Sequence, residues 1–231
     1  MNKISKYYHD YVFRNGKLVG EFEAMYRHSE EIPWHQDKQA NWVDVRLTRE
    51  MLSDAGLFDE IHDLGCGLGN YLELMRVHVG TDEVKCYGYD ISETATIKAK
   101  QQYPNFHLEV LDLTSSTNQP AKRLTNQPTN FRRLFIIRGT LWYVYPNLDA
   151  VIKTISAMMH EGDHLLVVQN FPPLGDSFIG KEVLPNHYAI IKRLSIAFSL
   201  VRHLWYEDTI FSANDNWFIG LFKINDVRKI K

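Results

Sequence analysis

The chain has 231 residues, of which 45% are hydrophobic and 23% are charged, and its formal net charge is −2. This balance is typical of a globular protein with one large domain, or a domain with a small appendage, and it excludes disordered, collagen-like and coiled-coil proteins. Because there is no excess of positive charge to attract a phosphate backbone, we expect no nucleic-acid partner.

Cysteine use and hydropathy bear on the cellular compartment. The cysteines, Cys66 and Cys86, indicate neither a disulfide framework nor a C-x-x-C metal site, which fits a reducing cytoplasm. No apolar run is long enough to cross a bilayer, and no apolar signal segment follows the start. We therefore predict a cytoplasmic protein with no metal ion and no membrane partner, and the sequence does not indicate its oligomeric state.

Residues 1–40 precede the predicted sheet and are rich in tyrosine, tryptophan and histidine. Asn15-Gly16 is a tight-turn signal between two short apolar runs, so a small hairpin is predicted, followed by a helix around Glu21–His28. Two interpretations of the aromatic side chains are open: they attach an appendage to the core, or they form a lid over a ligand. We divide the chain into this N-terminal extension, residues 1–40, and a main domain, residues 41–231.

The main domain opens with a predicted helix over residues 41–55. Val43, Leu47 and Met51 recur there at helical spacing, and Gly56 ends the run. This helix is expected to pack beside the first strand of the sheet.

A strand, a glycine turn and a helix come next, and the other elements are arranged around them. The strand closes in Asp63, glycines stand at positions 65, 67 and 69, and a helical pattern begins at Asn70. Such a turn presents a helix N-terminus and bare backbone to a nucleotide-like ligand, because glycine has no Cβ. The spacing is G-x-G-x-G rather than the G-x-G-x-x-G of dinucleotide sites, and a carboxylate at Asp63 would repel a pyrophosphate but suits an ammonium group.

Two further predicted strands also end in acids. Residues 84–89 lead to Asp90, at about the distance from the glycine turn at which an acid accepts hydrogen bonds from ribose hydroxyls. A helix over 92–103, with Ser92 as its N-cap, precedes a strand over 106–111 that ends in Asp112. Strand-end acids at this spacing favour a nucleotide-like ligand over ordinary helix caps.

This combination resembles the class I S-adenosylmethionine (SAM)-dependent methyltransferases, whose first motif is an acid followed by G-x-G-x-G. The resemblance covers about residues 41–224, with specific motifs only at 63–70, 90 and 112. It implies an α/β fold with a seven-stranded, mostly parallel sheet, an antiparallel last strand and flanking helices. It also implies SAM as the cofactor, with S-adenosylhomocysteine (SAH) as its product. The implied cofactor contacts, with Asp112 at the adenine amino group, are Asp63, Gly65, Cys66, Gly67, Gly69, Asn70, Asp90, Ile91, Asp112, Leu113 and Arg138.

The remaining chain continues the alternation of strands and helices. Residues 114–131 form a polar tract with two Thr-Asn-Gln-Pro copies, which we interpret as an exposed insertion. The elements expected after it are strands over 134–137 and 165–168 around a helix capped by Asn147, a helix near 186–195, and a hairpin of strands over 200–211 and 217–224.

In the family that the chain resembles, the end of the fourth strand faces the transferable methyl group. This places Tyr143 as a catalytic candidate and Trp142 as a substrate-binding residue, together with Asn170 at the end of the fifth strand. Methyltransferases that act on exocyclic amines of bases or on glutamine amides often carry Asn/Asp-Pro-Pro-Tyr/Phe here. The sequence has Arg-Gly-Thr-Leu at 138–141 instead, which counts against those substrates.

We expect the N-terminal extension to act as a lid. Residues 33–36, Pro-Trp-His-Gln, combine a stiff turn, a flat aromatic ring and two hydrogen-bonding groups. His35 is the preferred catalytic histidine, since imidazole exchanges protons near neutral pH. Tyr7, Tyr11 and Trp34 are the predicted substrate-binding residues of the extension.

The sequence therefore predicts an enzyme that transfers a methyl group from SAM to an oxygen or nitrogen atom of a small molecule. The acceptor classes left open are a sugar, a phosphorylated precursor and a secondary metabolite. A catalytically silent SAM- or nucleotide-binding partner subunit is the alternative from a different class. An NAD-dependent oxidoreductase ranks third because of the glycine spacing.

Overall fold

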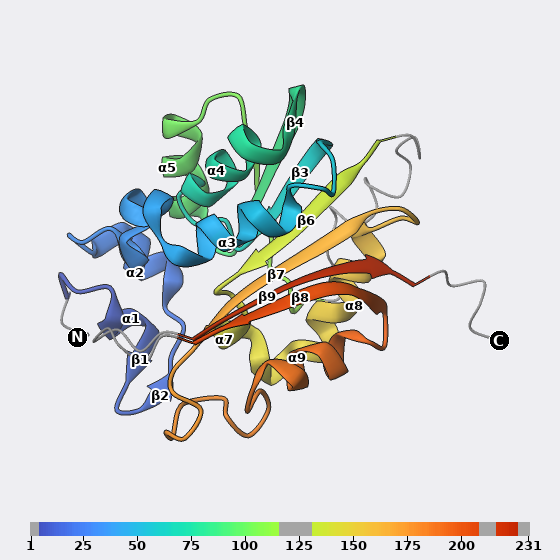
Figure 1. Ribbon diagram of the computed structural model, residues 1–231. Coiled ribbons are helices and arrows are strands. Elements are labelled where there is room, and N and C mark those ends of the chain that lie inside the picture. The colour runs from blue at the N-terminus through green and yellow to red at the C-terminus, as the bar shows by residue number, and fades with distance from the viewer. Residues whose placement is uncertain (1–4, 116–130, 208–215, 226–231) are drawn as a thin grey trace.

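The computed structural model describes residues 5–115, 131–207 and 216–225. The predicted insertion over residues 114–131 therefore lies almost entirely outside the described residues, as does the end of the predicted strand over 200–211. The described chain forms a central sheet with helices on both faces and the N-terminal extension at one end (Figure 1).

The central sheet has seven strands in the order β5-β4-β3-β6-β7-β9-β8. All neighbouring pairs from β5 to β7 are parallel, and β9 runs antiparallel to both β7 and β8. The predicted fold class is thus confirmed, including the antiparallel last strand. The strands are β3 (Phe58–Leu64), β4 (Gly80–Asp90), β5 (His107–Val110), β6 (Arg133–Arg138), β7 (His164–Phe171), β8 (Phe198–Tyr206) and β9 (Asn216–Ile224).

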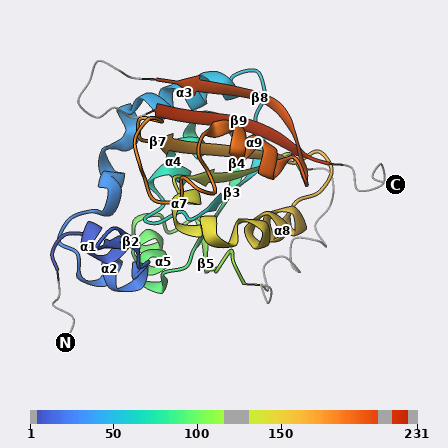
Figure 2. The same cartoon turned by 90° about the horizontal axis from the view of Figure 1, so that it is seen from below.

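The middle strands are apolar along their length because helices cover both faces of the sheet. Successive side chains point to opposite faces, so Ile136 and Val168 join one apolar cluster while Phe135 and Val167 join the other. Helices α3 (Val43–Leu52) and α4 (Asn70–Val79) belong to the first layer, and α8 (Leu148–Met158) and α9 (His187–Leu194) belong to the second. Figure 2 shows these layers with the molecule of Figure 1 seen from below.

Side-chain caps fix two of the helix starts. The Ser92 side chain accepts a hydrogen bond from the Ala95 N–H at the start of α5 (Glu93–Gln102), as the sequence predicts, and Asn186 accepts one from the Ala189 N–H at the start of α9. Asn147 is the N-cap residue of α8, as predicted, but its side chain makes no cap hydrogen bond. The short helices α7 (Leu141–Val144) and η2 (Tyr145–Asn147) lead the chain into α8. Within the described residues, no helix combines the length and apolar character needed to span a bilayer.

The N-terminal extension folds into its own small unit against α5. Its elements are α1 (His9–Val12), β1 (Phe13–Arg14), β2 (Lys17–Leu18), α2 (Phe22–His28) and η1 (Pro33–Asn41). The predicted hairpin is present, with Asn15 and Gly16 at φ 50° and 71° in its turn, but it is shorter than expected because Tyr11 and Val12 are helical. Met25 of the extension and Ala95 of α5 share one apolar cluster, and both ribbon views place α2 beside α5.

Candidate functional site

A cavity of about 820 Å³ lies where the carboxyl ends of the parallel strands meet the N-terminal extension. In open α/β sheets this edge is the usual ligand site, and the volume is within the usual range of about 300–1,000 Å³ for ligand pockets. The predicted site residues that line the cavity are Trp34, His35, Asp63, Gly65, Cys66, Asp90, Ile91, Asp112, Leu113, Arg138, Trp142, Tyr143 and Asn170.

The glycine turn contacts the extension as well as the cavity. The Gly67 N–H donates to Asp90 Oδ2 (2.9 Å), and the Leu68 N–H donates to Gln36 Oε1 (2.8 Å). A Cβ on Gly67, whose φ is 54°, would lie 2.6 Å from side-chain atoms of both Gln36 and Tyr26. The prediction that a ligand lies against Gly67 is therefore wrong for this arrangement, because the extension fills that space. Nor do Gly69, the N-cap of α4, and Asn70, its first residue, line the cavity, whereas Tyr71 does.

Asp63 is a buried acid in the wall of the cavity. Its side chain is 2% exposed, and no hydrogen bond to its carboxylate is found within the described residues. The pKa of Asp63 is raised to about 7. Burial is the largest cause and raises it, the Arg138 guanidinium lowers it, and the Asp90 carboxylate raises it. A cation placed against Asp63 would favour its charged form.

Arg138 is held rigidly beside Asp63. Its Nε donates to Asp44 Oδ2 (2.8 Å), and its Nη1 donates to Gln39 Oε1 (2.7 Å). The guanidinium also stacks on the Tyr71 ring, 4.6 Å from its centroid, with Trp42 and Trp217 further out. An arginine fixed in this way offers a preorganised partner for a carboxylate.

Asp90 and Asp112 project from the ends of β4 and β5 into the same cavity. Asp90 accepts the Ser92 N–H at Oδ1 and the Gly67 N–H at Oδ2, both at 2.9 Å. Burial raises the pKa of Asp90 to about 6 in spite of these hydrogen bonds. Asp112 Oδ1 accepts the N–H and hydroxyl of Thr114. Each carboxylate keeps lone pairs that hydroxyl or amino groups of a ligand can use.

Four aromatic rings, here called the aromatic wall, line the same cavity as these acids. Trp34 lies 5.5 Å from Tyr143 and 5.6 Å from Tyr8 between ring centroids, and Phe22 lies 5.3 Å from Tyr143. Burial raises the pKa of the Tyr143 phenol, and a hydrogen bond with the Trp34 side chain lowers it by less, so the phenol is protonated near neutral pH and its O–H can donate a hydrogen bond. This direction of shift disfavours Tyr143 as a general base.

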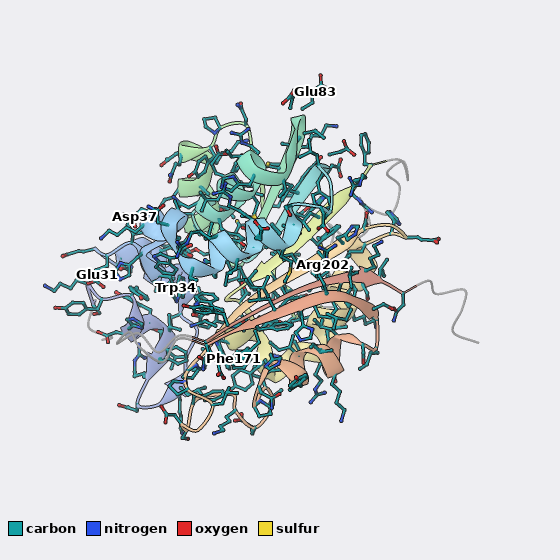
Figure 3. The ribbon with its side chains drawn as sticks, viewed as in Figure 1. Glu31, Trp34, Asp37, Glu83, Phe171 and Arg202 are labelled. Atoms are coloured by element: carbon teal, nitrogen blue, oxygen red, sulfur yellow. The ribbon has the colours of Figure 1, made fainter. Side chains whose placement is uncertain are left out.

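Backbone strain marks Trp34 and His35, two residues of the extension that the sequence predicts at the site. Trp34 (φ 51°) and His35 (φ 49°) both adopt the left-handed conformation, which non-glycine residues rarely occupy. The Trp34 carbonyl accepts a hydrogen bond from Gln39 Nε2 at 2.9 Å, and the ring is packed in the aromatic wall. Figure 3 shows Trp34 on the inner side of this end of the molecule, with Glu31 and Asp37 further out. Such strain persists only where the surroundings fix it, and it is common at ligand clamps.

Two predicted substrate residues lie outside the cavity. Tyr7 is 50% exposed and does not line it. Tyr11 is buried within the extension, where its hydroxyl donates to the Ser5 carbonyl (2.7 Å). The structure thus does not support Tyr7 and Tyr11 as residues of the cavity. Tyr8, which lies between them in the sequence, lines the cavity instead. On the other wall, Trp142 and Asn170 are joined by a hydrogen bond from the indole N–H to the Asn170 carbonyl (2.9 Å).

Glu23 joins the extension to the N-terminus of α5, a contact that the sequence does not predict. Its carboxylate accepts the Ser92 hydroxyl (2.7 Å) and both the hydroxyl (2.6 Å) and the N–H (3.0 Å) of Thr94. The hydrogen bonds from Thr94 and Ser92 lower the pKa of Glu23 from 4.5 to about 2. A carboxyl group with a lowered pKa stabilises the docked extension fully above pH 4.5 and loses that contribution as the pH falls toward 2.

We expect the Thr94 amide to exchange its hydrogen faster as the pH is lowered from 4.5 to 2, beyond the intrinsic change in exchange rate. In Glu23→Gln this extra pH dependence should disappear, because the amide keeps an acceptor oxygen but does not titrate. Glu21→Gln, which alters an exposed pair with Arg14, is the matched control. Hydrogen exchange measured by NMR checks this, and equal pH dependence in wild type and Glu23→Gln would contradict it.

Comparison with solved structures relates this fold to known proteins. The N-methyltransferase NodS from Bradyrhizobium japonicum, in complex with SAH, matches with a TM-score of 0.63 at 15% identity, over 84% of this chain and 92% of its own. A TehB-like SAM-dependent methyltransferase from Corynebacterium glutamicum matches with a TM-score of 0.53 at 15% identity, over 84% of this chain and 100% of its own. The [4+2]-cyclase SpnF matches with a TM-score of 0.54 at 12% identity, over 78% and 80%.

The chain thus has the Rossmann-like fold of class I SAM-dependent methyltransferases, as the sequence motifs predict. Neither protein-family models nor curated protein sequences gave a match. At these identities the similarity concerns the fold, and the chemistry has to be argued from the site.

Proposed function

We propose that the protein is a SAM-dependent methyltransferase that acts on an oxygen or nitrogen atom of a small molecule. The observation that carries this proposal is the pair of Asp63 and Arg138 in one wall of the cavity. A buried carboxylate with a raised pKa beside a fixed guanidinium is suited to the ammonium and carboxylate groups of an amino-acid moiety.

The other strand-end acids fit the rest of this cofactor. Asp90 keeps acceptor capacity for two vicinal ribose hydroxyls, with Ile91 beside it in the cavity wall. Asp112 and Leu113 supply an acceptor and an apolar surface for an adenine ring. SAM, when bound, supplies an activated methyl group on a positively charged sulfur.

The side chains across the cavity would hold the acceptor and exclude water. Trp34 offers a flat face, the Tyr143 hydroxyl offers a donor, and His35 at the rim offers a nitrogen that can take a proton. Correct placement of two reactants supplies much of the rate enhancement of such reactions. The extension therefore acts as the lid of the site, with residues 41–231 as the cofactor-binding domain.

Two alternatives use the same fold differently. A dinucleotide is disfavoured, because the amides of Gly67 and Leu68 already donate to Asp90 and Gln36 rather than pointing to a pyrophosphate. A SAM-binding protein without methyl transfer is the second candidate, and the matching cyclase fold shows that other reactions occur on this scaffold.

A cytoplasmic location is part of the proposal, supported by two buried free cysteines.

The substitutions Trp34→Ala and His35→Ala should each lower methyl transfer by about tenfold or more, equivalent to roughly 1.4 kcal/mol of barrier. Their affinity for SAH should change much less, because neither residue belongs to the strand-end acids. Calorimetry for SAH beside turnover measurements on the same preparations checks this. Unchanged turnover in both variants would contradict the lid and would mean that the aromatic side chains only attach the extension to the core.

The proposal as a whole is tested by identifying what the protein carries and transfers. Native mass spectrometry of the purified protein should find SAM or SAH bound. Incubation with SAM labelled in its methyl group and a panel of metabolites should transfer the label to an oxygen or nitrogen acceptor. Bound NAD, or bound SAM with no transfer to any acceptor class, would favour the alternatives.

A further inference from the structure

We infer that the methyl acceptor is an uncharged, planar aromatic compound of one or two rings that carries a hydroxyl group. The inference rests on the proposed function, since it names the acceptor class for the same cavity. The part of the cavity concerned, here called the acceptor compartment, is formed by the extension, α7 and the ends of η2 and β7. The lining residues on which the inference rests are Phe22, Trp34 and His35 of the extension, Trp142 and Tyr143 of α7, and Asn170 of β7.

Aromatic rings line this compartment from two separate parts of the chain. Phe22 and Trp34 belong to the extension, and Tyr143 belongs to α7. The rings pack against one another, with centroids 5.3 to 6.5 Å apart and interplanar angles of 39° to 70°. They therefore form a continuous wall rather than a cage around a cation. A wall of this kind favours a ligand that is itself flat and aromatic.

Among the described residues, the acceptor compartment carries no acidic or basic side chain other than histidine. The cavity-lining residues of the extension, α7, η2 and β7 include no lysine, arginine, aspartate or glutamate, whereas Asp63, Asp90, Asp112 and Arg138 lie at or just beyond the ends of β3, β4, β5 and β6. Transfer of an ammonium, carboxylate or phosphate group into such surroundings without a partner is strongly unfavourable. An uncharged acceptor avoids this penalty, which argues against alkyl amines, amino acids and phosphorylated compounds.

The polar groups of the compartment are hydroxyl, amide and imidazole groups. Burial raises the pKa of the Tyr143 phenol above its ordinary value, and Asn170 lies beside Trp142. His9 and His35 are exposed residues that line the compartment and bring ring nitrogens to its rim. Donors and acceptors of this kind match a hydroxyl group, which can donate one hydrogen bond and accept others.

The size of the cavity limits the acceptor further. Its volume of about 820 Å³ lies in the upper part of the usual range of about 300–1,000 Å³ for a single ligand. The same space must hold the cofactor along the strand ends. What is left suits a compound of one or two rings rather than an oligosaccharide or a peptide.

The inference is tested by binding to the full-length protein saturated with SAH, measured by calorimetry and by quenching of tryptophan fluorescence. The probes are 2-naphthol, its saturated analogue decahydro-2-naphthol, the anion 2-naphthoate and the cation (2-naphthylmethyl)trimethylammonium. We expect 2-naphthol to bind at least about tenfold more tightly than the other three probes. A saturated, anionic or cationic probe that binds as tightly as 2-naphthol overturns the inference.

Variants locate the binding. Trp34→Leu and Phe22→Leu should each weaken 2-naphthol binding by about tenfold with SAH affinity retained. Trp205→Leu, at a tryptophan outside the cavity, should leave both affinities unchanged. Circular dichroism checks folding, and either wall variant suffices if the other does not fold. Unchanged 2-naphthol affinity in the folded wall variants overturns the inference.

The two levels of the argument fail in different ways. A protein that binds SAH but not 2-naphthol overturns the acceptor class and leaves the proposed function standing. A protein that binds 2-naphthol without binding SAH overturns the proposed function instead.

Discussion

Replacing Arg138 with methionine should destabilise the protein by about 3–5 kcal/mol and abolish SAH binding. The Asp44 carboxylate is fully buried and pairs with this guanidinium, so the substitution leaves a buried charge without its partner. Tyr71 and Gln39 lose a stacking partner and a hydrogen-bond donor in the same step. Urea unfolding measures the loss of stability, and calorimetry measures the loss of binding.

A second substitution separates stability from binding. In Arg138→Met combined with Asp44→Leu, apolar side chains replace both charges, and much of the lost stability should return. SAH binding should not return, because the partner for the amino-acid carboxylate is still absent. A double variant that binds SAH as tightly as wild type would remove Arg138 from the cofactor site.

The substitution Gly67→Val should eliminate SAH binding and release the extension from the glycine turn. Its Cβ would lie 2.6 Å from Gln36 and from the Tyr26 hydroxyl, so these side chains must move. Loss of the Gln36 acceptor for the Leu68 N–H and displacement of the turn from Asp90 follow. Calorimetry for SAH and proteolysis of the extension in limited digests measure the two effects.

Gly162→Val is the matched control for backbone strain. Gly162 also has a positive φ, 94°, but a Cβ there would meet no atom within 4 Å. This variant should lose stability through its backbone conformation and keep SAH affinity. Normal SAH binding by Gly67→Val, or equal loss of binding in both variants, would contradict the dependence of SAH binding on the contact between the turn and the extension.

The sequence predicts the sheet well because the signals for it are local. The signals are the alternation of strands with helices, the glycines of the turn and the acids at strand ends. Each of them depends only on residues that are close together in the sequence. Asp63, Asp90 and Asp112 reach one cavity because parallel strands end at the same edge. These positions could be predicted without any knowledge of distant contacts.

The N-terminal extension is predicted less well because its contacts join distant parts of the chain. Gln36 meets Leu68, and Glu23 meets Thr94, and no periodic pattern marks such pairs. Two adjacent tyrosines also have different surroundings, although the residue type is the same: Tyr7 is exposed to solvent, whereas Tyr8 lines the cavity. Which ring points inward depends on the short helix α1 and on the left-handed residues of η1, which the sequence alone does not define.

The measurement that tests the central claim most directly is calorimetric titration of the purified protein with SAH and with NAD⁺ under identical conditions. We predict that SAH binds at one site with micromolar affinity and that, at about 100 times its dissociation constant, it stabilises the fold by about 2.7 kcal/mol. NAD⁺ should give no heat of binding and no change in melting temperature. Binding of NAD⁺ with no binding of SAH would contradict the assignment of the cavity to SAM.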